Sequence, residues 1–334
     1  MRVEDVLKGH GVGLSEKYIP LGGQFVRYPD FYEGGIQAES TFAFRRDVDD
    51  GLLYVLSKGS YTALHSFIFK NGHFILKESQ IRYNSSLASS NLALAYAQNS
   101  LFFSTSSGEI QQVDTETLTL GTKASVTSGA AILDLCSDGD FLYVASLYSK
   151  QPVVKIDPIT LTVVEESDFA IGRASYIRID GEYLYIVEGF GGGNKVFKVN
   201  KSDLSLITSV ILPGSDYPND FVIYGDYLYT VEKKITQLSK VGLNTIQTLN
   251  LGGSNYGVIG ATENTLVAGH MYSLLFIDRV NMEIVRDETE TGQYNFNMLS
   301  IPPYVIAIKN NSSRIRVYLT DVFQLKNSTK EVII

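Results

Sequence analysis

The chain of 334 residues is poor in the residue types that mark several common protein classes. Cys136 is the only cysteine, so no intramolecular disulfide can form, and its apolar strand-like surroundings are typical of a buried small side chain. Tryptophan is absent, which argues against repeat classes whose units depend on that residue. The four histidines have no spacing suited to a metal site or to catalysis, so we expect no metal, no cofactor and no catalytic residue among them.

Charge and hydrophobicity exclude two further classes. The formal net charge is −8 and no basic run occurs, so the positive surface that nucleic-acid binding requires is missing. No stretch of 18 consecutive apolar residues is present, so we expect no membrane insertion. The first ten residues lack the apolar centre of a secretory signal, and we therefore expect a protein of the cytoplasm or of an assembled particle.

The chain does contain a repeat. An apolar pair recurs at steps of 38 to 49 residues, and a period of about 40 residues is that of one four-stranded propeller blade. Because the pair recurs seven times, we predict seven units. The pairs are Leu53-Tyr54, Phe102-Phe103, Leu142-Tyr143, Leu184-Tyr185, Leu228-Tyr229, Leu266-Val267 and Val305-Ile306.

Turn signals on either side of the pairs support this interpretation. Dipeptides such as Asp180-Gly181 and Gly225-Asp226 precede the paired residues and indicate tight hairpins, since Gly and Asp tolerate positive φ. Two further strand-like runs follow each pair, as in residues 153–157 and 161–164. We therefore predict four antiparallel strands in each unit, with the first strand innermost and the fourth outermost.

One copy of the repeat resembles a known family. Phe141-Leu142-Tyr143-Val144-Ala145, followed by residues 153–157 and 161–163, is similar to the YVTN type of β-propeller repeat. The resemblance covers residues 41–334 as a pattern and implies an all-β, seven-bladed β-propeller of four-stranded antiparallel blades. It implies no activity, because propellers serve as enzymes, receptors and scaffolds alike.

Residues 1–40 do not fit the repeat. Their glycine and proline content breaks regular structure, yet they are rich in aromatic side chains. We expect an irregular, extended arm that docks on its own propeller or on a partner. We further expect that folding of residues 41–334 does not need this arm and that the arm anchors the chain to a protein partner. The anchoring side chains are Tyr18, Ile19, Phe25, Tyr28, Phe31 and Tyr32.

The sequence leaves the closure of the ring open. The last copy has candidate fourth strands in residues 322–325 and 331–334, and the ring would then close by packing of sheet faces alone. Alternatively, the arm around residues 24–28 adds a strand to the last blade.

The most repetitive polar feature is a glycine followed closely by a tyrosine in the loops that lead into each copy. We expect these loops on one face near the central channel, where the flat ring and hydroxyl of tyrosine suit a receptor protein or a glycan. The alternative is that each tyrosine is wedged between blades as part of the connector. The candidate residues are Arg173, Tyr176, Tyr217, Asp220, Asn255, Tyr256, Tyr294 and Asn295.

Two functional classes fit these observations. We favour a non-catalytic binding and assembly module, for instance a structural protein of a virion or other large assembly, with the propeller as binding head and the arm as anchor. The alternative is a propeller hydrolase, lactonase-like or carbohydrate-active, that uses carboxylates at the central channel. Arg173, Glu188 and Asp220 are the charged candidates for that chemistry. Carboxylates and an arginine around a deep pocket would favour the hydrolase.

Overall fold

The computed structural model shows an all-β protein in the residues that it describes. No helix long and apolar enough to cross a membrane occurs among these residues. The described residues are 18–21, 26–27, 39–45, 51–58, 62–70, 73–83, 93–105, 108–147, 152–189, 193–214, 217–252, 256–269, 273–289, 296–302, 304–309, 314–320, 322–325 and 331–332.

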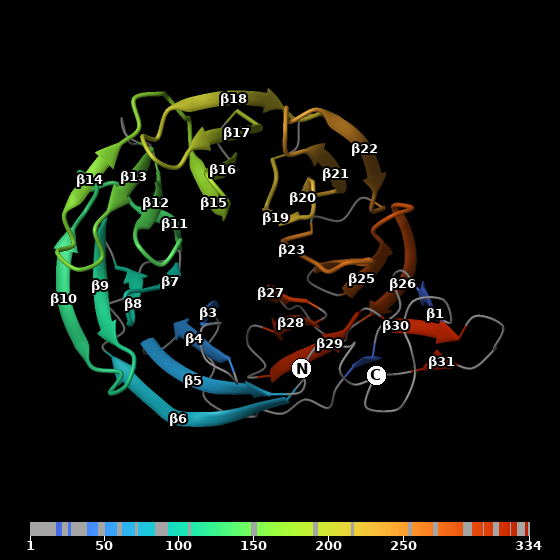
Figure 1. Cartoon of the computed structure of the whole chain (residues 1–334), viewed down its shortest axis with the longest axis horizontal. Coiled ribbons are helices and arrows are strands. Elements are labelled where there is room, and N and C mark those ends of the chain that lie inside the picture. Colours follow the sequence, from blue (N-terminus) through green and yellow to red (C-terminus); the bar gives the residue numbers. More distant parts are fainter. Residues whose placement is uncertain are drawn as a thin grey trace.

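The described strands form four-stranded antiparallel sheets, numbered I to VII in chain order, which are consistent with propeller-like blades. Figure 1 shows them around a common centre, with the first strand of each sheet nearest to that centre. Sheets II to VI are described almost continuously, and sheets I and VII over fewer residues.

The strands of the first four sheets have the following bounds. Sheet I contains β3 (Glu39–Arg45), β4 (Leu52–Lys58), β5 (Thr62–Lys70) and β6 (His73–Tyr83). Sheet II contains β7 (Leu94–Ala97), β8 (Ser100–Ser104), β9 (Glu109–Asp114) and β10 (Leu120–Ser125). Sheet III contains β11 (Ile132–Ser137), β12 (Leu142–Ser146), β13 (Val153–Ile156) and β14 (Val163–Glu166). Sheet IV contains β15 (Ala174–Asp180), β16 (Tyr183–Glu188), β17 (Lys195–Asn200) and β18 (Leu206–Ile211).

The remaining strands complete three further four-stranded sheets and a smaller one. Sheet V contains β19 (Asp220–Tyr224), β20 (Tyr227–Val231), β21 (Lys234–Ser239) and β22 (Thr245–Asn250). Sheet VI contains β23 (Val258–Ala261), β24 (Thr265–Gly269), β25 (Ser273–Asp278) and β26 (Glu283–Thr289). Sheet VII contains β27 (Phe296–Ile301), β28 (Tyr304–Lys309), β29 (Arg314–Leu319) and β2 (Val26–Arg27). A three-stranded sheet contains β1 (Tyr18–Leu21), β30 (Val322–Leu325) and β31 (Glu331–Val332).

The apolar pairs that mark the repeat form the centre of each sheet, as predicted. Each pair lies in the second strand of its sheet and is buried. Tyr185, for example, packs with Phe221 and Leu228 between sheets IV and V. Similar clusters join sheets I and II, II and III, III and IV, V and VI, and VI and VII. The core is therefore a series of layers between neighbouring sheets, as expected for a repeat architecture.

A recurring turn between the third and fourth strands was not apparent from the sequence. In sheet III, Asp157 Oδ1 accepts hydrogen bonds from Ile159 N at 2.7 Å and Thr160 N at 3.1 Å. Leu161 then adopts a left-handed conformation with φ of 55° and donates its N–H to Asp157 O at 2.8 Å. Its buried side chain offsets the cost of this conformation, which is about 1–2 kcal/mol. Equivalent left-handed residues are Leu118, Leu204, Leu243 and Met282.

The N-terminal arm completes the last sheet. β2 pairs with β29 in the register Val26↔Leu319 and Arg27↔Tyr318, so the arm supplies the fourth strand of sheet VII. Residues 41–334 therefore do not contain all the strands of the repeat. Of the two alternatives that the sequence left open, this pairing confirms the one in which the arm around residues 24–28 adds a strand to the last blade.

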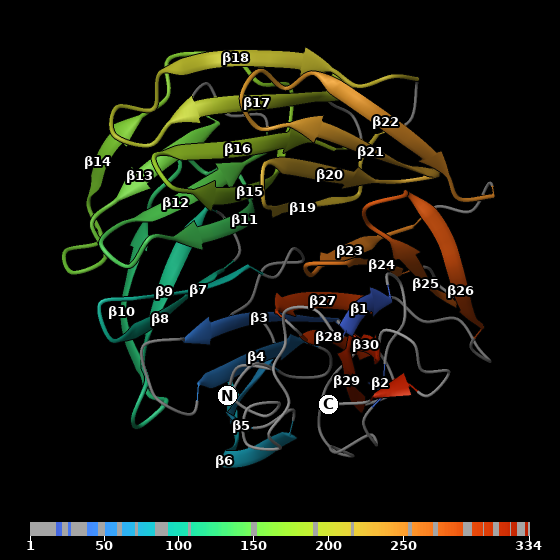
Figure 2. The same ribbon diagram turned by 45° about the vertical axis from the view of Figure 1, so that its right-hand side comes forward.

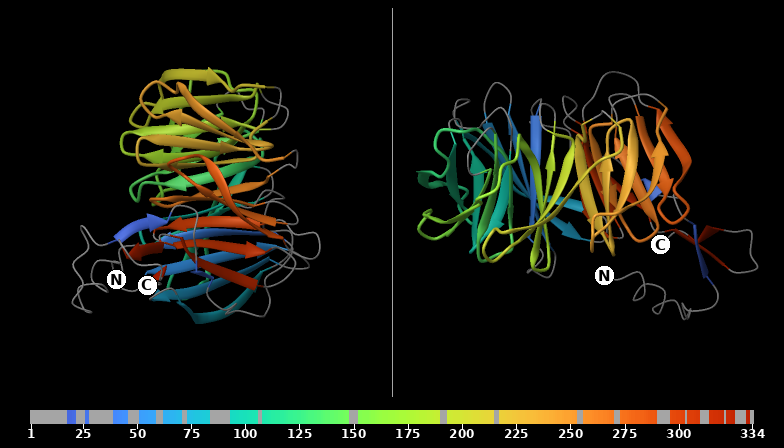
Figure 3. Two further views of the ribbon diagram at one scale, coloured as in Figure 1. Left: turned by 90° about the vertical axis from the view of Figure 1, so that its right-hand side faces the viewer. Right: turned by 90° about the horizontal axis from the view of Figure 1, so that it is seen from above.

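The C-terminal residues proposed for that fourth strand have another place. β30 pairs with β1 and β31 in the three-stranded sheet, so residues 322–325 do not belong to sheet VII. Figures 2 and 3 show β1 and β30 side by side, outside the arrangement of the larger sheets. Tyr18 and Ile19, assigned to the anchor, thus pair within the chain, opposite Leu325 and Gln324. The other four anchor residues, Phe25, Tyr28, Phe31 and Tyr32, lie outside the described residues.

Candidate functional site

The candidate tyrosines lie at the same end of three neighbouring innermost strands. Tyr176 lies near the start of β15, while Tyr217 and Tyr256 shortly precede β19 and β23. Asn219, between Tyr217 and β19, donates its side-chain N–H to Tyr256 O at 2.9 Å and so links successive connectors. Three other candidates, Asn255, Tyr294 and Asn295, lie outside the described residues.

Burial separates these tyrosines. Tyr256 is 5% exposed and packs with Tyr229 and Ile259 between sheets V and VI. Burial raises the pKa of its phenol, as it does for Tyr176, which packs against the cluster between sheets IV and V. Tyr256 thus has the wedged position that was the alternative to a binding role. Tyr217 is only partly buried, and the backbone of Arg173 forms an isolated antiparallel β-bridge with Leu147, which directly follows β12.

A cluster that the sequence did not predict joins three innermost strands. Asp134 of β11 and Asp220 of β19 flank the guanidinium of Arg178 of β15. Arg178 Nη1 donates to Asp134 Oδ2, and Nη2 donates to Asp220 Oδ1 at 3.2 Å. The guanidinium also lies over the ring of Phe221, with Cζ 5.4 Å from the ring centroid. We call Asp134, Arg178 and Asp220 the channel triad.

The carboxylate oxygens of the channel triad also accept hydrogen bonds from backbone amides. Asp134 Oδ2 also accepts from Ile177 N at 3.0 Å, and its Oδ1 accepts from Leu135 N at 2.9 Å. Asp220 Oδ2 accepts from Ile259 N at 3.1 Å, in sheet VI. The channel triad therefore connects the innermost strands of sheets III, IV, V and VI, and each of its carboxylate oxygens already has a donor.

The electrostatics of the channel triad follow from one cation between two acids. Burial raises the pKa of Asp220 to about 6, and the charge of Asp134 adds to this effect, although Arg178 and backbone amides partly offset it. Burial alone would lower the pKa of Arg178, but the two carboxylates outweigh it and raise that pKa above its usual value. Burial also raises the pKa of the nearby Cys136 thiol, so this cysteine is not an activated nucleophile.

Two glutamates at the same position of neighbouring sheets differ in their partners. Glu188 and Glu232 each follow the apolar pair of their sheet by the same number of residues and are nearly buried. Glu188 Oε1 accepts from Gly172 N at 2.7 Å and Oε2 accepts from Gly193 N at 2.7 Å, so this side chain holds two connectors together. Glu232 Oε2 is buried and has no hydrogen-bond partner among the described residues, while Oε1 lies 3.7 Å from Lys233 Nζ.

A small recess adjoins Glu232. It has a volume of about 10 Å³, enough for one water-sized group, and it is half open. The recess lies at the same end of the sheets as Tyr217, because Pro218 forms part of its wall. Lys234 also contributes to the wall, and its ammonium group donates a hydrogen bond to Pro213 O. The lining residues are Leu212, Pro218, Thr230, Val231, Glu232, Lys234 and Thr236.

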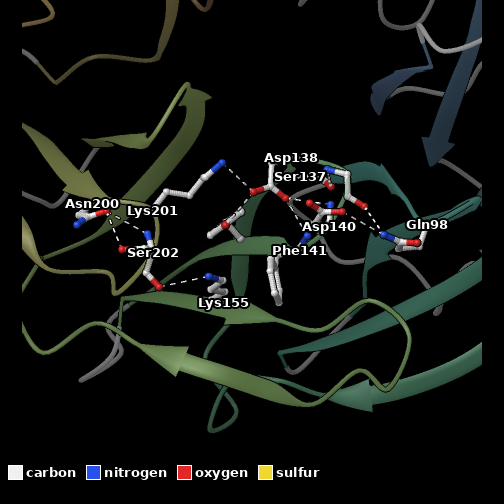
Figure 4. Close-up of polar contacts among 11 residues, drawn as sticks. Gln98, Ser137, Asp138, Asp140, Phe141, Lys155, Asn200, Lys201 and Ser202 are labelled. Atoms are coloured by element: carbon white, nitrogen blue, oxygen red, sulfur yellow. Dashed lines mark hydrogen bonds and ion pairs between the residues drawn. The ribbon is translucent and has the colours of Figure 1, made fainter.

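The opposite end of the sheets carries a repeated contact between lysines and aromatic rings, drawn in Figure 4 for sheets III and IV. Lys155 Nζ lies 4.2 Å from the ring centroid of Phe141 and donates to Ser202 O of sheet IV at 3.3 Å. In return, Lys201 of sheet IV reaches Asp138 Oδ2 at 3.1 Å. These two lysines thus join adjacent sheets in both directions.

The same contact recurs between sheets IV and V. Lys198 Nζ lies 4.0 Å from the ring centroid of Tyr183 and donates to Lys240 O at 2.9 Å. Lys240 in turn binds Asp180 of sheet IV. Burial lowers the pKa of Lys198, and the nearby charge of Lys240 acts in the same direction. These lysines stabilise the packing of adjacent sheets. A lysine within an otherwise apolar third strand, after a Phe-Leu-Tyr or Tyr-Leu-Tyr segment at the second strand, is the sequence pattern that could have predicted this contact.

Comparisons with known proteins give no further assignment. No protein-family model matches the chain, and no curated protein matches it. No group of three or more metal-binding side chains occurs among the residues that the structure describes.

Proposed function

We propose that sheets I to VII close into a seven-bladed β-propeller of YVTN-like repeats, formed by residues 41–334 and completed by the arm of residues 1–40. Neighbouring sheets share apolar clusters, β27 lies close to β3, and β2 joins the last sheet to the N-terminal part of the chain. Pairing of the first and last parts of the chain in one blade is an efficient way to close a ring, because opening the ring must then break a β-ladder.

We propose that this propeller is a non-catalytic binding module. The observation that carries the proposal is the use of the channel triad: its carboxylates are occupied by Arg178 and by backbone amides of sheets III, IV and VI. A hydrolase needs an acid or base that can reach a substrate, and hydrogen bonds that hold sheets together do not leave these oxygens free. The recess described beside Glu232 is also too small for a substrate.

The binding face that we propose is the end of the sheets that carries Tyr217 and the recess beside Glu232. Partly exposed tyrosine and arginine side chains are typical of the centres of binding surfaces. The form that we propose is a structural protein of a virion or other large assembly, whose head binds a receptor. Anchoring to a protein partner would fall to arm residues outside β1 and β2, because both strands pair within the chain.

Two measurements on the full chain test this proposal. Lactones and aryl glycosides are offered to the wild type and to Asp220→Asn; we expect no turnover, and turnover that depends on Asp220 would establish the hydrolase instead. Retention of the partner from the native source is then compared for the wild type and Tyr217→Ala. We expect at least about a tenfold loss, the usual effect of truncating a central aromatic contact. Equal retention would move the binding face elsewhere.

A further inference from the structure

The unpartnered oxygen of Glu232 marks a place for a hydrogen-bond donor. A buried carboxylate oxygen without a partner is costly, and native proteins nearly always satisfy such groups. Glu188 shows how the same repeat position is satisfied when no ligand is needed, through Gly172 N and Gly193 N. At Glu232 the chain turns back at once through Lys233 into β21, and no amide of the described residues donates to Oε2. None of the described residues supplies the missing partner.

Size and charge limit what that partner can be. The recess admits one water-sized group, so a single functional group enters it while the rest of the ligand stays on the surface. Lys233 and Lys234 both lie beside Glu232, and their positive charges disfavour a metal ion or an amine. A neutral hydroxyl donates a hydrogen bond to Oε2 without adding charge. Thr230 and Thr236, both buried, also line the recess.

We propose that the Glu232 recess receives one hydroxyl of a polyhydroxylated ligand, a glycan, whose ring lies on the face that carries Tyr217. The inference rests on the proposed binding face and names its ligand class. Glu232 Oε2 accepts a hydrogen bond from this hydroxyl, and the charge of the carboxylate strengthens it. Pro218 joins the recess directly to Tyr217, whose phenol ring offers an apolar surface of the kind that sugar rings stack against.

The test uses a printed glycan array as the probe for the labelled full chain, followed by titration of the glycan that binds best. Glu232→Gln should weaken that affinity by about 10- to 100-fold, the range for a lost hydrogen bond to a charged group. The same substitution at exposed Glu166 of β14 is the matched control and should leave the affinity unchanged. Glu232→Gln should not lower Tm, whereas Glu188→Gln should, since only Glu188 holds two backbone amides.

Three results would overturn the inference. If no glycan binds while Tyr217→Ala still reduces partner retention, the face binds a protein and the glycan assignment fails although the binding module stands. If a glycan binds and Glu232→Gln leaves its affinity unchanged, the sugar site lies elsewhere. If a crystal structure with the glycan shows only a water molecule in the recess, Glu232 is satisfied by solvent.

Discussion

Replacing Arg178 with methionine tests whether the channel triad holds the sheets together. The variant Arg178→Met keeps an unbranched side chain of similar length but removes the cation between Asp134 and Asp220. Both carboxylates then depend on backbone amides alone, chiefly Ile177 N and Ile259 N. We therefore expect a folded but less stable protein.

The magnitude follows from the exposure of the group. Removing one partner of a buried ion pair costs about 3–5 kcal/mol, but the Arg178 side chain is 38% exposed and solvent weakens its interactions. We expect a loss of about 2–4 kcal/mol in the free energy of unfolding. At about 2.1 cal/mol/K per residue, 334 residues have an unfolding entropy near 0.7 kcal/mol/K, so Tm should fall by about 3–6 °C.

A double-mutant cycle identifies the cause. Asp220→Asn should be more favourable in Arg178→Met than in the wild type, because there it removes a charge that has already lost its partner. The free energies of unfolding of the four proteins are measured by denaturant titration at pH 7. Additive effects, or an unchanged stability of Arg178→Met, would refute the assignment of the channel triad as a stabilising contact.

Further predictions concern pH, the arm and the lysine contacts. Burial raises the pKa of Asp220 from its ordinary value of 3.8 to about 6, so between these two values the folded protein binds a proton that the unfolded chain releases. Stability should therefore fall by about 3 kcal/mol as pH rises through that interval, and a pH series on Asp220→Asn should lack this slope. Deleting residues 1–37 should lower the free energy of unfolding by roughly 1–3 kcal/mol, since the ladder with Leu319 and Tyr318 is lost, and unchanged thermal unfolding would show that β2 is dispensable. Lys198→Met should lower the free energy of unfolding by about 1–3 kcal/mol, because the contacts with Tyr183 and Lys240 O are lost. Chemical denaturation measures this change, and the control Lys195→Met on the same strand should have a smaller effect.

The sequence predicted those features of the fold that repeat within a short segment. Leu184-Tyr185 and its counterparts are central because a strand between two sheet faces must be apolar on both sides. Gly181 and Gly225 have positive φ, as the hairpin interpretation required. Period and turn chemistry are local properties, so they can be read from the chain before it folds.

Contacts between distant segments could not be predicted in the same way. β2 is two residues long, and only its pairing with β29 distinguishes it from the rest of the arm. The channel triad joins positions more than 40 residues apart, whose meeting depends on how successive sheets are rotated. A charged residue inside an apolar strand, as at Asp134 and Arg178, was the available signal. The burial of Tyr256 likewise depends on packing between sheets V and VI.

Photo-crosslinking from position 217 tests the binding account most directly. A crosslinking amino acid replaces Tyr217 in one protein and exposed Ile246 of β22 in a control, and each full chain is irradiated with its native source material. The account predicts a discrete crosslinked product from position 217 that unlabelled wild-type protein competes away, and no such product from position 246. Equal products from both positions, or none from position 217 while the partner is retained, would contradict a binding face at this end of the sheets.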